Sequence, residues 1–326
     1  MPADSHAAGL SFPPLPEAIH ELALQTIHLV YEEQFSEALQ TARRIVRTAG
    51  DHPAGYFFCA SVLDAHMAFE MSSRFENDFY RYCNEAIERG ETRLSREPDD
   101  VWSRFFVGGA EGLKGNYESR YQRWITAFRS GWKGVSILRR IQDVYPAMAD
   151  LRYGIGTYRY WRSAMTDVMR WMPGVKDERH EGIEDLRTSF RFGLYTAVAS
   201  GQNLLEVYLN EELFAQVVSL ADSLLSRYPE NTSFRWHKAR ALIGMGDYQG
   251  ALGYLIPLRE RFDQIQTSHF NSVTVRCSLI RAYMGLNETD SAHKMRNEIR
   301  QFEVPSELQR QAQLEITTID QLLQGR

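Results

Sequence analysis

Residues 214–258 read FAQVVSLADSLLSRYPENTSFRWHKARALIGMGDYQGALGYLIPL, and they repeat their own apolar pattern after 34 positions. The matching positions are Phe214 and Tyr248, Val217 and Ala251, Ala221 and Leu255, and Leu224 and Leu258. Pro229 closes the first unit, and Gly246-Asp247-Tyr248 forms a tight turn that opens a second helix. This period is typical of antiparallel helix pairs that stack on one another. The sequence therefore predicts an all-α solenoid built from helix hairpins.

Similar signals for helix starts, turns and helix ends recur along the rest of the chain. Hairpins are expected over 17–45, 54–95 and 102–144, the third with a turn at Gly115-Asn116-Tyr117 and a break at Ser130-Gly131. The last hairpin follows an insertion of seven residues near 264–272, and a helix over 305–323 would cap the stack. We therefore expect an extended lead-in over 1–16 and a single domain over 17–326. Its middle, 121–195, is irregular, and its best repeats span 198–264.

Composition excludes several classes of protein. Few alternating Val/Thr-rich runs occur among the 326 residues, so we expect essentially no strand. The net charge is −5 and the 37 basic residues are dispersed, which argues against a nucleic-acid partner. No run approaches the ~18 apolar residues that span a bilayer. Residues 1–16 lack the pattern of a signal peptide. These features predict a cytoplasmic protein, exported only if a signal peptide was removed from the sequence.

No motif indicates a catalytic residue, a cofactor or a metal. The glycines of 108–115 lack the GxxxxGK[ST] order of a phosphate loop, and Gly154-x-Gly156 lacks the third glycine of a dinucleotide motif. Close packing of helices explains both clusters better, because a missing side chain lets neighbouring helices approach. His180-Glu181 would need a second histidine at 184 to form HExxH, where Glu184 stands.

The repeat residues resemble those of the tetratricopeptide-repeat family, whose 34-residue helix pairs carry Gly-Asp-Tyr, a following alanine and a closing proline. The matching residues are Tyr208, Phe214, Ala221, Pro229, Ala239, Gly246, Asp247, Tyr248 and Ala251. The chain departs from the family at Trp236, one position beyond the usual tryptophan, and at Val217, where alanine is usual. Residues 108–112 and 154–161 resemble a bacterial subgroup of such proteins. The resemblance implies a right-handed superhelical solenoid of antiparallel helix hairpins.

The resemblance also implies a binding site. In the family, the first helices of each pair line a concave groove, and their fifth and ninth positions touch the ligand. Here these positions are Gln202 with Glu206, Trp236 with Arg240, and Cys277 with Arg281. Arg240 and Arg281 could bind a carboxylate through two parallel hydrogen bonds. Alternatively, both arginines are solvated or form salt bridges within the protein.

The middle of the chain allows two interpretations. Apolar residues form a helical stripe at Leu151, Ile155, Tyr158, Met165, Met169 and Met172. In the first interpretation this stripe is core, and the methionines fill irregular space between hairpins. In the second, Tyr153, Tyr160, Trp161 and Trp171, which lie off the stripe, face a groove and anchor a peptide.

The sequence therefore predicts a non-catalytic scaffold that binds a protein or peptide in its groove. One alternative is an enzyme or small-molecule-binding protein whose helical array encloses a pocket near Tyr153, Tyr160 and Trp161. Two titratable groups within hydrogen-bond reach of a closed cavity would favour this alternative. Another possibility is self-association through the last hairpins.

Overall fold

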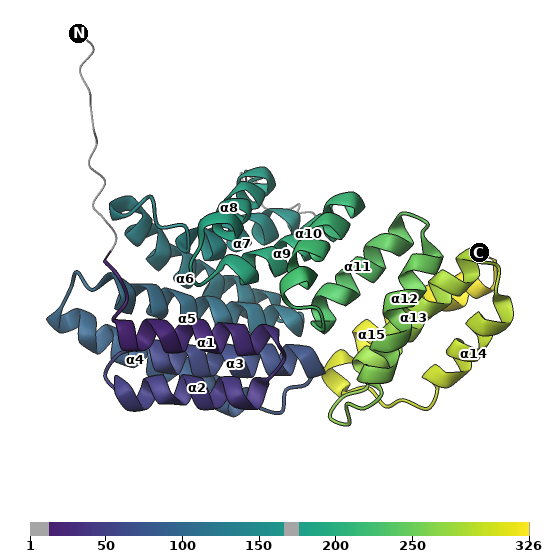
Figure 1. The fold of residues 1–326 in the computed structure, drawn as a ribbon, viewed down its shortest axis with the longest axis horizontal. Helices are drawn as coiled ribbons and strands as arrows, with labels where there is room; N and C mark the ends of the chain where they lie inside the picture. Colours follow the sequence, from purple (N-terminus) through teal and green to yellow (C-terminus); the bar gives the residue numbers. More distant parts are fainter. Residues whose placement is uncertain (1–12, 166–175, 326) are drawn as a thin grey trace, which may run out of the picture. The chain divides into compact units, whose positions relative to one another are not determined.

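The computed structural model describes residues 13–165 and 176–325, and this part of the chain is helical without any strand (Figure 1). The all-α prediction is confirmed. The α-helices are α1 (Glu17–Tyr31), α2 (Phe35–Thr48), α3 (Ala54–Glu70), α4 (Glu76–Arg96), α5 (Val101–Arg120), α6 (Trp124–Val144), α7 (Leu151–Ala164), α8 (Arg179–Phe192), α9 (Ala197–Asn210), α10 (Phe214–Arg227), α11 (Thr232–Gly244), α12 (Tyr248–Phe262), α13 (Phe270–Gly285), α14 (Thr289–Ile299) and α15 (Gln309–Leu323).

Consecutive helices pack as hairpins, as the sequence predicts. Helices α5 and α6, α7 and α8, α11 and α12, and α13 and α14 pack against each other, and α12 also packs against α13. The apolar repeat positions are the buried ones, because Val217, Ala221, Ala251 and Leu255 have no exposed surface. A one-turn 3₁₀ helix (Ser306–Leu308) leads into α15, which packs on α13 at the position expected for a cap.

Six hairpin turns share one backbone conformation. In each, a residue with a φ between 51° and 79° follows the first helix, and the next residue donates its N–H to the carbonyl five positions back. This pattern is the Schellman motif, which satisfies carbonyls left open at a helix end. The left-handed residues are Glu33, Met71, Gln122, Glu212, Gly246 and Asn287. A sequence signal for a turn at this position is therefore strong only at Gly246, where the residue is glycine.

The described residues group into two compact units. Among the described residues, unit 1 takes 13–30, 34–64, 77–165 and 176–201, and unit 2 takes 31–33, 65–76 and 202–325. Unit 2 contains residues 202–264 of the best repeats, and its buried core draws on α11 through α15. The expected single domain over 17–326 stays a prediction. The expected lead-in falls mostly outside the described residues, and 13–16 have no regular secondary structure.

Glycines bring α5 and α6 of unit 1 into backbone contact. A Cβ atom on Gly134 would lie 2.7 Å from the carbonyl oxygen of Gly108 and 2.9 Å from the nitrogen of Gly112. A Cβ on Gly115 would lie 3.0 Å from the nitrogen of Gly131. The prediction that the 108–115 glycines serve close packing is confirmed. The turn expected at 115–117 and the break expected at 130–131 are wrong, because both helices run through these glycines.

Two further glycine contacts follow the repeat in unit 2. The first residue of α10, Phe214, places its ring where a Cβ on Gly244 of α11 would lie. The first residue of α12, Tyr248, does the same to Gly285 of α13. Helices α10 and α12 therefore each begin with an aromatic ring that packs on a glycine near the end of the next first helix.

A short upstream segment fixes the start of α11. The Glu33 carboxylate accepts hydrogen bonds from the Thr232 backbone N–H (2.7 Å) and hydroxyl (2.5 Å), and it pairs with Arg261 at 2.5 Å. Burial raises the pKa of Glu33, although the bonds from Thr232 and the charge of Arg261 act against it. Asn231 donates to the Tyr31 carbonyl (2.9 Å), so residues 31–33 hold the N-terminus of α11 within unit 2.

Candidate peptide-binding surfaces

Four residues of unit 2 carry a charge at equivalent positions, on the first helices α9, α11 and α13 and on the capping helix α15. Arg240 Nη1 of α11 lies 3.5 Å from Glu206 Oε2 of α9, and Arg281 Nη2 of α13 lies 2.7 Å from Glu315 Oε2 of α15. The partners in both pairs are 34 residues apart. Helix α11 also packs on α13, so the order of charges across the four helices is negative, positive, positive, negative. We call Glu206, Arg240, Arg281 and Glu315 the charge ladder.

Glu206 has a stronger partner than Arg240. His237 Nε2 lies 2.9 Å from Glu206 Oε2, and its Nδ1 lies 2.6 Å from the Ser233 carbonyl oxygen. Because both ring nitrogens face oxygens, this geometry suits a ring that donates from both. Burial by itself raises the pKa of Glu206, but the hydrogen bond from His237 and the charges of His237 and Arg240 outweigh it and lower the pKa to about 2. Glu206 is therefore ionised, and Arg240, 41% exposed, is only loosely engaged.

The two other predicted groove residues lie beside this pair. Gln202 of α9 donates its side-chain amide to the Ser233 hydroxyl of α11 at 3.1 Å. Trp236 is half-buried, and its ring meets that of Phe262 edge to face at a centroid distance of 6.2 Å. The structure therefore brings Gln202, Glu206 and Arg240 together on α9 and α11, and Trp236 lies one turn before Arg240 on α11.

Arg281 sits in a more enclosed environment. Its side chain is 31% exposed, and its Nη2 pairs with Glu315 of the capping helix, which orients the guanidinium group. Cys277, one turn earlier on α13, has no exposed surface. The fifth position of this unit is thus core, and the ninth is the one that reaches the surface.

The central aromatic residues differ from expectation. Tyr160 has no exposed surface, so the structure contradicts its expected role as an anchor. It lies where α7 meets α8, since a Cβ on Gly182 would touch the Tyr160 backbone. Tyr153 and Trp161 are half-buried, and burial raises the pKa of Tyr153 to about 12. Trp171, Met169 and Met172 lie outside the described residues.

Sequence reasoning missed an open hollow on α6 of unit 1. It has a volume of about 580 Å³ and is lined by Glu111, Arg129, Trp132, Lys133, Ile137 and Arg140, with two serines. We call it the α6 groove. Lys133 Nζ pairs with the buried Glu111 carboxylate at 2.6 Å. A signal for the groove was present, because Trp132 falls off the apolar side of α6, whose buried residues include Ala127, Val135, Leu138 and Ile141.

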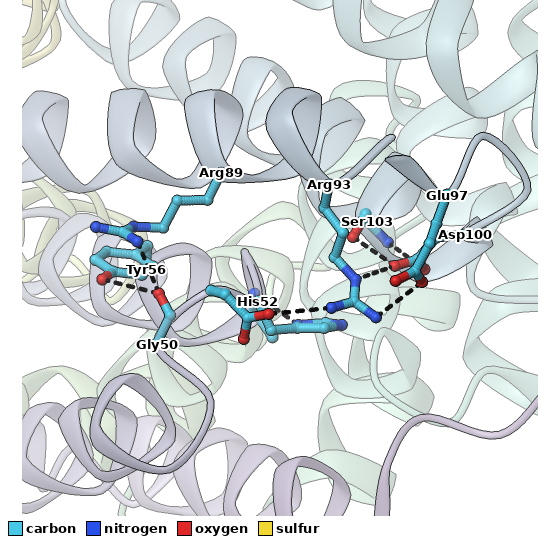
Figure 2. Close-up of polar contacts among 10 residues, drawn as sticks. Gly50, His52, Tyr56, Arg89, Arg93, Glu97, Asp100 and Ser103 are labelled. Atoms are coloured by element: carbon cyan, nitrogen blue, oxygen red, sulfur yellow. Dashed lines mark hydrogen bonds and ion pairs between the residues drawn. The ribbon is translucent and has the colours of Figure 1, made fainter. Parts of the chain in front are cut away.

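A third polar group, the Arg93 cluster, lies in unit 1 (Figure 2). Arg93 bonds to Asp100 (2.5 Å), Glu97 (3.1 Å) and Asp51 (3.3 Å). Asp100 also caps α5 by accepting from the backbone N–H groups of Trp102 and Ser103, both at 3.1 Å. Burial raises the pKa of Asp100, but these bonds and Arg93 outweigh it, so the pKa is lowered. The three carboxylates accept hydrogen bonds from Nε, Nη1 and Nη2 of the Arg93 guanidinium.

His52 completes this region between α2 and α3. Its Nδ1 accepts a hydrogen bond from the Ala54 backbone N–H at 3.2 Å. Burial lowers the pKa of His52 to about 4, with the nearby charge of Arg93 acting in the same direction and that of Asp100 against it. Arg89 and Tyr56 both donate to the Gly50 carbonyl, at 2.9 and 3.3 Å (Figure 2). The Arg93 cluster and its neighbours therefore fix the α2–α3 turn against the end of α4.

Within the described ranges, no group of three or more His, Cys, Asp or Glu side chains is arranged to hold a metal ion. No helix of the described part combines the length and the apolar character needed to cross a bilayer.

Comparison with known proteins yields likenesses to solved structures. No family model matches the chain. A search of curated proteins finds no match. Among solved structures, the chain is similar to yeast Tom70, with a TM-score of 0.39 and 12% sequence identity over 97% of this chain. The match spans 66% of the length of that Tom70 chain.

Proposed function

We propose that this protein is a non-catalytic scaffold that binds another protein through the charge ladder face of unit 2. The observation that supports this proposal is the register of the ladder, in which Arg240 and Arg281 are neighbours in the middle and each has its carboxylate partner on the outer side. A carboxylate of a bound peptide, placed between them, would pair with two guanidinium groups.

The surroundings of Arg240 favour a peptide as the partner. Trp236 lies one turn before it and is only half-buried, so part of its ring can cover an apolar side chain. Gln202 is also half-buried and offers an amide that can bond to a peptide backbone. We therefore propose an acidic residue flanked by an apolar one as the recognised element. The proposal places the protein in the cytoplasm and makes its partner a protein rather than a nucleic acid.

Two pools of fluorescent 12-residue peptides test this function. One pool carries a central Asp or Glu in an apolar-rich background, and the other carries Asn or Gln at the same position. We expect the protein to prefer the acidic pool by fluorescence polarisation. Arg240→Glu with Arg281→Glu should weaken binding at least tenfold, because it replaces two attractions by repulsions, and it should create a preference for a third pool with central lysine.

The matched control is Arg300→Glu with Arg310→Glu, which makes the same charge change at exposed arginines of unit 2. Arg240→Gln with Arg281→Gln guards against misfolding, since it leaves no repulsion against Glu206 and Glu315. Thermal melting followed by circular dichroism checks that each variant is folded. Equal binding of the acidic and amide pools, or unchanged affinity in both ladder variants, would rule out the ladder as the binding face.

A further inference from the structure

We propose that the α6 groove of unit 1 is a second docking site, independent of the charge ladder, and that its occupant is an acidic amphipathic helix of a partner protein. The exposed apolar residues of α6 support a helical partner, its charge supports an acidic one, and its length sets the size of the partner helix.

The outer side of α6 carries large apolar residues. Ile125 is 89% exposed and Trp132 is 52% exposed. They are seven positions apart, which places them on the same side of a helix, two turns from each other. Half-buried Phe128 lies between them in sequence at the same spacing of three and four residues. This spacing is the one with which a partner helix interlocks its own apolar side chains.

Trp132 is held in place for such a contact. Its ring lies 6.1 Å from that of Tyr158 on α7, measured between centroids. An exposed tryptophan with a supported ring loses little freedom when a partner covers it, which is why tryptophan is common among residues that dominate binding energy.

The charge of the groove is positive. Arg129 and Arg140 are exposed and form no ion pair with any described residue, whereas Lys133 is already paired with Glu111. Two cations are therefore available to a partner, in a chain whose net charge is −5. Binding to nucleic acid is driven by neutralising many phosphates, and two cations are few for that purpose. An acidic protein segment fits the groove better.

The length of the groove matches a short helix. Arg129 and Arg140 are eleven positions apart on α6, which corresponds to about 16 Å or about three helical turns. Ser130 and Ser136 line the same hollow, and their small side chains allow another backbone to approach. A partner helix of about three turns, with acidic residues near both ends and an apolar stripe between them, would satisfy both arginines.

The test uses a designed 18-residue helical peptide with a leucine stripe bordered by glutamates, titrated into the full-length protein by calorimetry. A peptide with lysine in place of every glutamate serves as its counterpart. We expect binding of the glutamate peptide only. Arg129→Glu with Arg140→Glu, and separately Trp132→Ala, should each weaken binding at least tenfold. Arg44→Glu with Arg47→Glu, exposed arginines of α2 in the same unit, should leave it unchanged.

Trp132→Phe supplies a second readout. It should keep most of the binding and abolish the shift in tryptophan fluorescence that the peptide causes in the parent protein. Arg240→Glu with Arg281→Glu should not affect this peptide, which separates the second site from the proposed function. The proposal is overturned if the lysine peptide binds as well, or if Arg129→Glu with Arg140→Glu has no effect. It is also overturned if single-stranded RNA displaces the peptide, or if sedimentation shows that the protein self-associates and that Trp132→Ala makes it monomeric.

Discussion

Left-handed backbone positions show how far single residues reveal their structural role. Glycine adopts a positive φ without steric cost, and Gly246 marks its turn plainly in the sequence. Gln122 and Glu212 adopt the same conformation in equivalent turns, although side chains of this kind rarely do. Their conformation is imposed by the two helices that they join, so the third hairpin turn was misplaced at 115–117 rather than at 121–123.

His52 should make unit 1 sensitive to acid. Its pKa is about 4 in the folded protein against an ordinary value of 6.5, so between these pH values only the unfolded chain binds a proton there. The stabilising contribution is therefore complete above pH 6.5 and is lost as the pH falls towards 4. We expect the free energy of unfolding to decrease by up to about 1.4 kcal/mol per pH unit in this window.

Urea unfolding at pH 7, 5.5 and 4.5 measures this slope. His52→Asn should flatten it, because the asparagine oxygen can accept the Ala54 N–H in place of Nδ1 and does not titrate. His293→Asn removes an exposed imidazole and serves as the comparison. A slope that persists unchanged in His52→Asn would assign the acid sensitivity to other groups.

At the scale of helices, the α5–α6 contact makes a sharp prediction for two glycines. Gly134→Ala should destabilise unit 1 by about 2 kcal/mol, because its Cβ would meet the backbone of Gly108 and Gly112, which cannot rotate away. Gly112→Ala should instead stabilise the protein by about 0.5–1 kcal/mol, since a Cβ there meets nothing within 4 Å and alanine favours a helix.

Chemical unfolding of the two variants, monitored by circular dichroism, gives both free energies. Opposite signs are expected although the substitution is the same. If Gly134→Ala cost no more stability than Gly112→Ala, the two helices would not be in the close contact described.

The same contact explains which elements were predictable. A period of 34 residues located the hairpins of unit 2, because each repeat buries the same apolar positions, such as Ala221 and Leu255. The glycines of α5 and α6 are clustered as in a turn, but they form the surface through which the two helices pack. Local sequence alone does not distinguish these roles, because the difference lies in the presence of a second helix whose backbone leaves no room for a Cβ atom.

For the molecule as a whole, the two candidate surfaces differ in how the sequence encodes them. The positions of Arg240 and Arg281 follow from the repeat, and the structure adds their carboxylate partners, Glu206 and Glu315. The α6 groove exists because no described element covers Trp132, and a repeat pattern in the sequence does not reveal whether a residue is covered. Tyr160 was misassigned for the opposite reason, because α8 covers it.

Glu33 provides a prediction at this scale. Its pKa is raised, so burial disfavours its charge, and its hydrogen bonds to Thr232 should matter more than its pairing with Arg261. Glu33→Gln keeps an acceptor for Thr232 and should change the free energy of unfolding little. Glu33→Ala removes the acceptor and should cost about 1–2 kcal/mol. Urea unfolding compares the two, and equal losses would mean that the ion pair is the dominant contribution.

The distance in sequence between Glu33 and Thr232 has a consequence for biogenesis. Glu33, which accepts the Thr232 N–H at the start of α11, leaves the ribosome 199 residues before its partner does. During synthesis, residues 31–33 therefore cannot make their contacts in unit 2 until α11 has been translated. Closing so long a loop slows the final folding step. A chaperone acting on the nascent chain would have most to protect in that interval.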